Sequence, residues 1–358
     1  MEEQSSVKRR SFLQTVLLSF LSIGTGGALS AQEEKEKIKA LPKKDRIGTP
    51  LPLPPNQDVV WTSCFSPSGK KAVLVCGDMT KKSVFLADFP VKNRDDYQLI
   101  KSFDNCCKID GISVYEGEDP LIALRETRFQ LDTILTGIQT SDEWKAACED
   151  HNINEKSFSS SILVVDIDGN QTIVGETAAS LKESLTASAA WQNEKTLWFL
   201  DKESRTLSRF NLSSNNNERT TLKDVCPLTK IQQISYNKEK DVLIALDSDR
   251  QIGTIDPEDC RVELKSPLDR YIPDVDINDV PCLDSNGESV VLQTDHMLIK
   301  YNIDDHSIAK LEFCNNDSTD FRLASISSSA DAILVYLAGD IIREGRAPLT
   351  ELRTLKIQ

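Results

Sequence analysis

The segment FSPSGKKAVLV, residues 65–75, decides the fold, because its pattern returns along the rest of the chain. Each copy is a polar turn followed by a short apolar strand that is rich in Val, Ile and Leu, which is typical of β structure. The later copies are VYEGEDPLIAL (114–124), AWQNEKTLWFL (190–200), SYNKEKDVLIAL (235–246), LDSNGESVVLQ (283–293) and SSSADAILVYL (327–337). The body of the chain is therefore a series of repeated β units.

A second hairpin follows the first in nearly every unit, so that each unit holds four strands. The units recur every 45 to 47 residues, from Trp191 to Tyr236, Leu283 and Ser328. Four strands at this period are typical of a β-propeller blade. We expect an all-β chain in which residues 58–358 form a single propeller of six blades, the alternative being seven. The second hairpins are 85–103, 163–176, 207–222, 252–266 and 299–313, and 349–357 closes the last unit.

The first copy also carries a family resemblance. FSPSGK resembles the Phe-Ser-Pro-Asp-Gly-Lys segment of WD-repeat and YVTN-type bacterial propellers, whereas the Gly-His and Trp-Asp pairs of true WD repeats are absent from the units. The resemblance is strong in the first unit and is a polarity pattern in the others. It implies a fold and leaves the function open, because propellers carry many unrelated functions.

The second unit is longer than the others. Tyr115 to Trp191 spans 76 residues, and the excess lies between Arg125 and Ser161. Within it, SDEWKAACEDHN begins with Ser141, a residue type that caps helix N-termini. We expect a small helical insertion at residues 126–160 of the second blade. The alternative is a seventh, degenerate blade in this interval.

The N-terminus reads as an export signal. VKRRSFLQ (7–14) precedes a short apolar run and the small residues up to Ala31, and this core is too short to span a bilayer. Arg9 and Arg10 before Ser-Phe-Leu resemble the bacterial twin-arginine (Tat) signal, the alternative being a Sec signal that carries two arginines. The resemblance implies a periplasmic protein that folds before export, is cleaved near Ala31, and meets the membrane only through this signal.

Residues 32–57 are first charged and then Pro-rich, so we expect an extended tether, with the folded domain starting near Asp58. The formal net charge of the chain is −14, which argues against nucleic acid and anionic membranes as partners. Three histidines make a His-rich metal centre a poor expectation. Nine cysteines cannot all pair within one chain, and Cys64 and Cys76 lie in apolar strand patterns where buried free thiols are expected.

The clearest candidate site is acidic. Asp274, Asp276 and Asp279 crowd within YIPDVDINDVPC, and alternate residues of a strand share a face, so these carboxylates are candidates for Ca²⁺ in the central channel. The alternative is a solvated loop between blades. No other cofactor is indicated, and no catalytic motif is present in the sequence.

Composition and motifs together favour an exported module that binds a protein or a small ligand at one face of the propeller, and that is not an enzyme. The alternative is a lactonase-like or other hydrolytic propeller with a metal in the channel. A propeller that carries a redox cofactor ranks third, since its support is the export signal and the cysteines alone.

Overall fold

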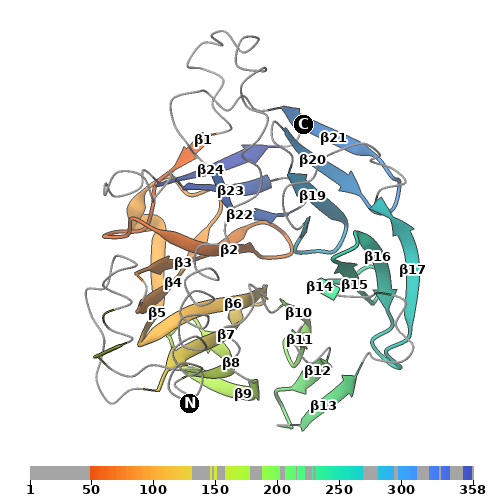
Figure 1. Ribbon diagram of the computed structural model, residues 1–358, viewed down its shortest axis with the longest axis horizontal. Coiled ribbons are helices and arrows are strands. Elements are labelled where there is room, and N and C mark those ends of the chain that lie inside the picture. The colour runs from red at the N-terminus through yellow and green to blue at the C-terminus, as the bar shows by residue number, and fades with distance from the viewer. Residues whose placement is uncertain are drawn as a thin grey trace, which may run out of the picture.

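The computed structural model of the chain shows a β-propeller (Figure 1). The structure describes residues 49–356 apart from gaps, the longest of which are 131–145, 151–157, 178–187, 222–227, 269–280, 313–321 and 339–349. Within the described residues the strands form six four-stranded antiparallel sheets. Among the described residues, the helical element with defined bounds is one 3₁₀ turn, η2 (Arg94–Asp96). No helix in this part of the chain is long and apolar enough to cross a membrane.

Each sheet is one blade, and the first three blades take consecutive strands from the chain. Blade 1 holds β2 (Val60–Phe65), β3 (Lys71–Gly77), β4 (Lys81–Asp88) and β5 (Tyr97–Asp104). Blade 2 holds β6 (Cys106–Tyr115), β7 (Leu121–Phe129), β8 (Phe158–Asp166) and β9 (Gln171–Thr177). Blade 3 holds β10 (Ser188–Asn193), β11 (Thr196–Asp201), β12 (Thr206–Asn211) and β13 (Asn216–Thr221).

The last three blades follow the same order, with one exception in blade 6. Blade 4 holds β14 (Ile231–Asn237), β15 (Val242–Asp247), β16 (Gln251–Ile255) and β17 (Val262–Pro267). Blade 5 holds β18 (Cys282–Leu283), β19 (Ser289–Gln293), β20 (Met297–Asn302) and β21 (Ile308–Glu312). Blade 6 holds β22 (Arg322–Ser328), β23 (Ala332–Ala338) and β24 (Thr350–Lys356), and its outer strand is β1 (Thr49–Leu51).

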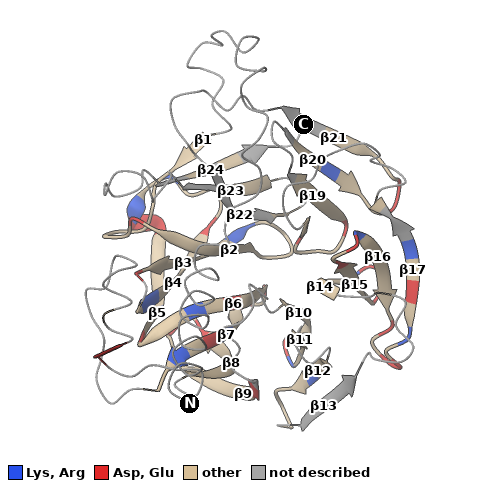
Figure 2. Cartoon of the chain, in the orientation of Figure 1, with Lys and Arg blue, Asp and Glu red and all other residues tan. Residues whose placement is uncertain are grey.

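The first strands of the blades surround the central axis and contact one another in turn, β2 with β6, β6 with β10, β10 with β14, β14 with β18, β18 with β22, and β22 with β2. The fourth strands lie at the rim (Figure 1). The outer strand β17 carries the charged residues Glu263 and Lys265, and Figure 2 shows both signs of charge along this strand. This order explains why the second strand of each unit is the most apolar: both of its faces pack against neighbouring blades.

The core lies between blades rather than within one of them. Alternate residues of β3 divide between two clusters: Ala72, Leu74 and Cys76 pack toward blade 6, whereas Val73 and Val75 pack toward blade 2. Period-two alternation thus places apolar groups on both faces of a strand. Three further clusters join blades 2 and 3, blades 3 and 4, and blades 4 and 5 in the same way.

The structure corrects the predicted start of the folded domain. Thr49–Leu51, within the predicted tether 32–57, form β1 and pair with β24, with Pro50 opposite Arg353. Leu51 and Leu53 pack against the cluster between blades 1 and 6. Within the described residues, the propeller therefore includes Thr49–Leu51, ahead of the predicted start near Asp58. The prediction was wrong because so Pro-rich a segment has no strand pattern of its own, and its β structure depends on an edge 300 residues away in the chain.

The bounds of the predicted insertion also need correction. β7 continues to Phe129 and β8 begins at Phe158, and these two residues face each other in the pairing. Both ends of the interval 126–160 are therefore strand, and the extra residues connect β7 to β8 inside blade 2. The predicted helix at Ser141 lies mostly outside the described residues, and its described residues Ala146, Glu149 and Asp150 are helical; a complete helical insertion is not shown.

Candidate functional site

The antiparallel order of the blades brings two sets of turns to the same end of the propeller. Within each blade, the turn between the first and second strands and the turn between the third and fourth strands leave the sheet on one side. We call this end the hairpin face. Its inner turns are 66–70, 116–120, 194–195, 238–241 and 284–288, with the turn after Ser328, and its described outer turns are 89–96, 167–170, 212–214, 256–261 and 303–307.

Hydrogen bonds draw the inner turns together near the axis. Ser285 Oγ donates to the carbonyl oxygen of Ser66 at 2.9 Å, and Ser285 N donates to the carbonyl oxygen of Ser328 at 3.1 Å. Ser66 and Ser328 are both buried. Blades 1, 5 and 6 are therefore tied to one another at this end of the channel by short polar residues.

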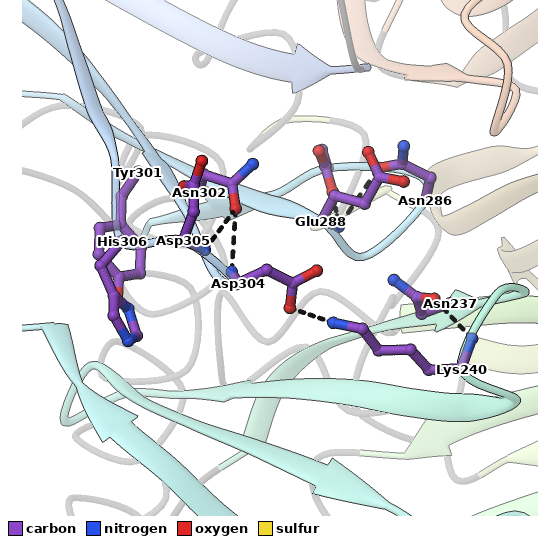
Figure 3. Close-up of polar contacts among 10 residues, drawn as sticks. Asn237, Lys240, Asn286, Glu288, Tyr301, Asn302, Asp304, Asp305 and His306 are labelled. Atoms are coloured by element: carbon purple, nitrogen blue, oxygen red, sulfur yellow. Dashed lines mark hydrogen bonds and ion pairs between the residues drawn. The ribbon is translucent and has the colours of Figure 1, made fainter.

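The turns of blades 4 and 5 form a dense polar joint (Figure 3). Lys240 forms an ion pair with Asp304 of the next blade, and Asn302 Oδ1 accepts the backbone N–H groups of Asp304 at 2.9 Å and of Asp305 at 3.3 Å. Tyr301, which is buried, shares a hydrogen bond of 2.6 Å with His306 Nδ1. These groups shape the turns and join the two blades, so this cluster is explained by structure alone.

The turns of blades 2 and 3 differ, because they enclose an open cavity of about 640 Å³. Its wall contains Tyr115, Leu121 and Leu212, which are the partly buried outer members of the cluster between these blades. The ring of Tyr115 lies 5.8 Å from that of the buried Trp191, centroid to centroid. The cavity is thus a hollow with an apolar patch on its wall, and its size is in the range of ligand-binding sites.

Charged residues stand at the mouth of this cavity. Glu118 and Asp119 come from the turn after β6, while Glu194 and Lys195 come from the turn after β10, and all four are exposed. Lys195 Nζ lies 3.7 Å from Glu194, an exposed ion pair of small energetic weight. The neighbouring Glu116 is already engaged, since it accepts hydrogen bonds from the backbone N–H and the hydroxyl of Ser68 in blade 1.

A second unusual group lies at the other end of blade 1. Lys82 on β4 is almost fully buried, its ammonium lies 4.3 Å from the centroid of the Trp61 ring, and it donates a hydrogen bond to the carbonyl oxygen of Asp78. Burial lowers the pKa of Lys82 to about 8, against the opposing effect of nearby Cys106 and Cys107. The enclosure leaves no room for a substrate, so Lys82 acts within the fold.

Blade 2 also buries an ion pair. Asp110 accepts two hydrogen bonds of 2.8 Å from Arg125 and lies 3.0 Å from Lys108 Nζ. Burial alone would raise the pKa of Asp110, but these two cations outweigh it and hold the pKa well below its ordinary value. Among the described first strands of the blades, Asp110 is the one carboxylate, and its oxygens are occupied by this contact.

The predicted site residues fall outside the described part of the chain. Asp274, Asp276 and Asp279 lie in the gap 269–280, and Arg9, Arg10 and Ala31 precede residue 49. The first of these sets lies between β17 and β18 in the sequence. Within the described residues no group of three or more His, Cys, Asp and Glu could hold a metal ion, so the calcium site stays a prediction.

Cys64, Cys76, Cys106 and Cys107, which lie on β2, β3 and β6, are free thiols. Burial raises the pKa of Cys64, Cys76 and Cys107 to about 12 in each case, which keeps these groups protonated and unreactive. The expectation of a buried free thiol is confirmed for Cys76, whereas Cys64 is a free thiol that is only partly buried.

The sequence reading missed both the cavity and Lys82. Lys82 left a visible signal, a lysine beside the apolar run SVFLAD of a strand. The sequence signal for the cavity is weaker: it consists of the carboxylates of EGED (116–119) and NEK (193–195). These are typical turn residues, and only the packing of two blades brings them to one cavity.

Comparisons with known proteins identify no family for this chain, and the similar solved structures are distant. No family model matches the chain, and no curated protein matches it. Similar solved structures include TolB from Acinetobacter baumannii, with 12% identity, a TM-score of 0.45, and coverage of 71% of this chain and 54% of that one. The chain thus spans about half the length of that TolB chain.

Two other similar structures come from different settings. One belongs to a nidogen/laminin complex, with 11% identity, a TM-score of 0.48, and coverage of 80% of this chain and 98% of that one. The other is the β-propeller domain of Cps50 (Swd1) from Myceliophteria thermophila, with 12% identity, a TM-score of 0.44 and coverage of 84% of both chains. At these values the likeness carries no functional argument, and the sheet topology is what establishes a β-propeller.

Proposed function

We propose that the protein is an exported binding and assembly module of the periplasm, which docks a partner on the hairpin face of the propeller. The observation that carries this proposal is the cavity between blades 2 and 3, because it combines an apolar wall with exposed polar groups on a rigid base. A preformed hollow of this composition is the usual form of a binding site.

The hydrolytic alternative receives less support from the same residues. A metal in the channel needs several oxygen ligands that converge from different blades. The described first strands supply Asp110 alone, and that carboxylate is held by Arg125 and Lys108. This argument does not bear on the candidate calcium ligands Asp274, Asp276 and Asp279. Elemental analysis of the mature chain with and without a chelator tests whether they bind a metal.

Export is tested with the signal residues themselves. The full chain and an Arg9→Lys/Arg10→Lys variant are expressed in a bacterial host, and the periplasmic fraction is examined by mass spectrometry. Twin-arginine export predicts a mature form that starts near residue 32 and disappears in the double-lysine variant. A mature form that persists in the variant would indicate the Sec route, and a full chain that stays uncleaved in the cytoplasm would refute export.

The docking face is tested by site-specific crosslinking in cells. A photoreactive amino acid replaces Glu194 at the cavity in one variant and the exposed Leu264 on the outer strand of blade 4 in the control. Docking at the hairpin face predicts a discrete crosslinked product from position 194 and none from position 264. Equal products from both positions, or none from position 194, would contradict the proposal.

A further inference from the structure

We propose that the cavity between blades 2 and 3 binds an arginine or lysine side chain presented by a peptide segment of the partner protein. This inference rests on the docking function proposed above, and it adds the chemistry of the group that is recognised. It is argued from three features of the cavity: its apolar wall, the sign of the charge at its mouth, and the close contact of Gly117 with Tyr115.

The wall and the mouth together fit one class of side chain. Apolar surface inside the cavity comes from Tyr115, Leu121 and Leu212. Carboxylates at its edge come from Glu118, Asp119 and Glu194. A group that satisfies both must have a long aliphatic stem and a cationic end. Lysine and arginine have this form, since they bury their stems along apolar surface and keep the charge at the rim.

The Tyr115 ring gives a second attraction to a cation. Its ring is tilted by 51° to that of Trp191, and it lines the cavity. A cation above an aromatic face is attracted by the ring quadrupole, and arginine uses this contact most often. The same chain already shows such contacts, with Lys82 over Trp61 and Arg209 over Trp198.

Charge complementarity supports a protein partner of basic local character. The chain carries a formal net charge of −14, so its field attracts cations and slows the approach of anions. The cavity volume of about 640 Å³ exceeds the space that one side chain fills, which leaves room for flanking residues of a peptide. An anionic polymer such as nucleic acid would face the three carboxylates directly.

One residue of the chain competes with the arginine or lysine side chain that is expected to bind. Lys195 lies 3.7 Å from Glu194 through its ammonium and stands at the same mouth. It neutralises one carboxylate and repels an incoming cation. The inference therefore predicts opposite effects for neighbouring residues: loss of a carboxylate weakens binding, and loss of the Lys195 charge strengthens it.

Gly117 allows the shape of the cavity to be tested apart from its charge. A Cβ atom at position 117 would lie 2.6 Å from Cε1 of Tyr115, so any larger residue there must push the ring aside. A Gly117→Val variant keeps every charge at the mouth and changes the wall. If the site recognises only charge, this variant binds normally.

The test uses the mature protein, residues 32–358, and a library of hexapeptides in which one central position is Arg, Lys, Gln or Glu. We expect the wild-type protein to enrich Arg and Lys, with affinity that falls as salt rises. The Glu118→Gln/Asp119→Asn/Glu194→Gln variant should lose about tenfold in affinity for the enriched peptides, as three exposed charge contacts imply. Gly117→Val should lose binding, and Lys195→Gln should gain a few-fold.

The matched control is Glu239→Gln, which removes an exposed carboxylate from the corresponding turn of blade 4, away from the cavity. It should bind as the wild-type protein does. Circular dichroism and melting curves of each variant confirm that the fold is retained. A library with no preference for Arg and Lys over Gln overturns the inference, and so does a triple variant that binds like the control.

Failure of this inference is distinguishable from failure of the docking function. If position 194 crosslinks to a partner in cells but the library shows no preference for cationic residues, the docking face stands and cation recognition is wrong. If position 194 gives no crosslink while the peptides still prefer Arg and Lys, the site exists and the proposed docking function is wrong. Both results can be obtained with the variants described.

Discussion

The strand β1 closes the last blade, and its removal should have a measurable cost. The perturbation is a shortened chain that begins at residue 58, compared with a control chain that begins at residue 49. The longer chain keeps the pairing of Thr49–Leu51 with β24 and the packing of Leu51 and Leu53. The shorter chain loses these contacts and leaves the apolar surface between blades 1 and 6 open to water.

The magnitude follows from the contacts that are lost. Leu51 and Leu53 are partly buried, so each should contribute about 1–2 kcal/mol, roughly half of what a fully buried leucine contributes. The hydrogen bond of 2.9 Å from the Tyr97 hydroxyl to the carbonyl oxygen of Pro52 adds about 1 kcal/mol. The sum is about 4 kcal/mol, a large part of the usual stability of a domain.

The assay is thermal and urea unfolding of both chains under the same conditions. At about 2 °C per kcal/mol for a domain of this size, the shorter chain should melt about 8 °C lower. A Tyr97→Phe variant of the longer chain should show a small part of this loss, because only the hydrogen bond to Pro52 is removed. Equal melting of the two truncated chains would show that β1 does not hold the ring closed.

Three further predictions follow from single contacts. Burying a charged Lys82 costs stability in full below its folded-state pKa of about 8, and the cost vanishes above the ordinary lysine pKa of 10.5. In urea unfolding, Lys82→Met should therefore stabilise the fold by about 3 kcal/mol at pH 7 and by progressively less at pH 9 and 10. A stability difference that stays constant with pH would contradict this. Gly69 has a φ of +70°, and a Cβ atom there would lie 2.5 Å from Ser329 Oγ. Gly69→Ala should therefore lower stability by about 1–3 kcal/mol in thermal unfolding. If Ser329→Gly restores part of the lost stability, that part comes from the collision and the remainder from backbone strain. Arg125→Met should cost about 3 kcal/mol in urea unfolding, because the buried Asp110 loses both hydrogen bonds from Arg125 and keeps only its ion pair with Lys108. A double variant with Asp110→Leu should recover part of that loss, and a double variant as unstable as the single one would refute the explanation.

The repeat made most of the fold predictable. FSPSGKKAVLV and its copies place the inner turn and the second strand of each blade where the structure has them, because a strand packed on both faces needs an unbroken apolar run. β1 could not be predicted, since its strand conformation comes from the free edge of β24 rather than from Thr49–Leu51 themselves. Local sequence patterns predicted the fold correctly, and the error arose at a strand whose pairing is long-range.

The candidate site was less predictable for a related reason. Glu118 and Glu194 are separated by more than 70 residues, and only the stacking of blade 2 on blade 3 places them around one hollow. Tyr115 gives no sign in the sequence that it lines a cavity. By contrast, Asp274, Asp276 and Asp279 attracted attention because they are close in sequence, which is a poor guide to sites built between blades.

The closure of blade 6 by both chain ends also sets the order of events when the protein is made. Thr49 is among the first residues of the domain to be synthesised, and its partner Thr354 is among the last. Bringing together segments about 300 residues apart in a flexible chain costs roughly 5 kcal/mol in loop-closure entropy, so this pairing is unfavourable until the intervening blades have shortened the path. A chain that stops before β24 therefore lacks the strand with which Thr49–Leu51 pair, and blade 6 stays incomplete.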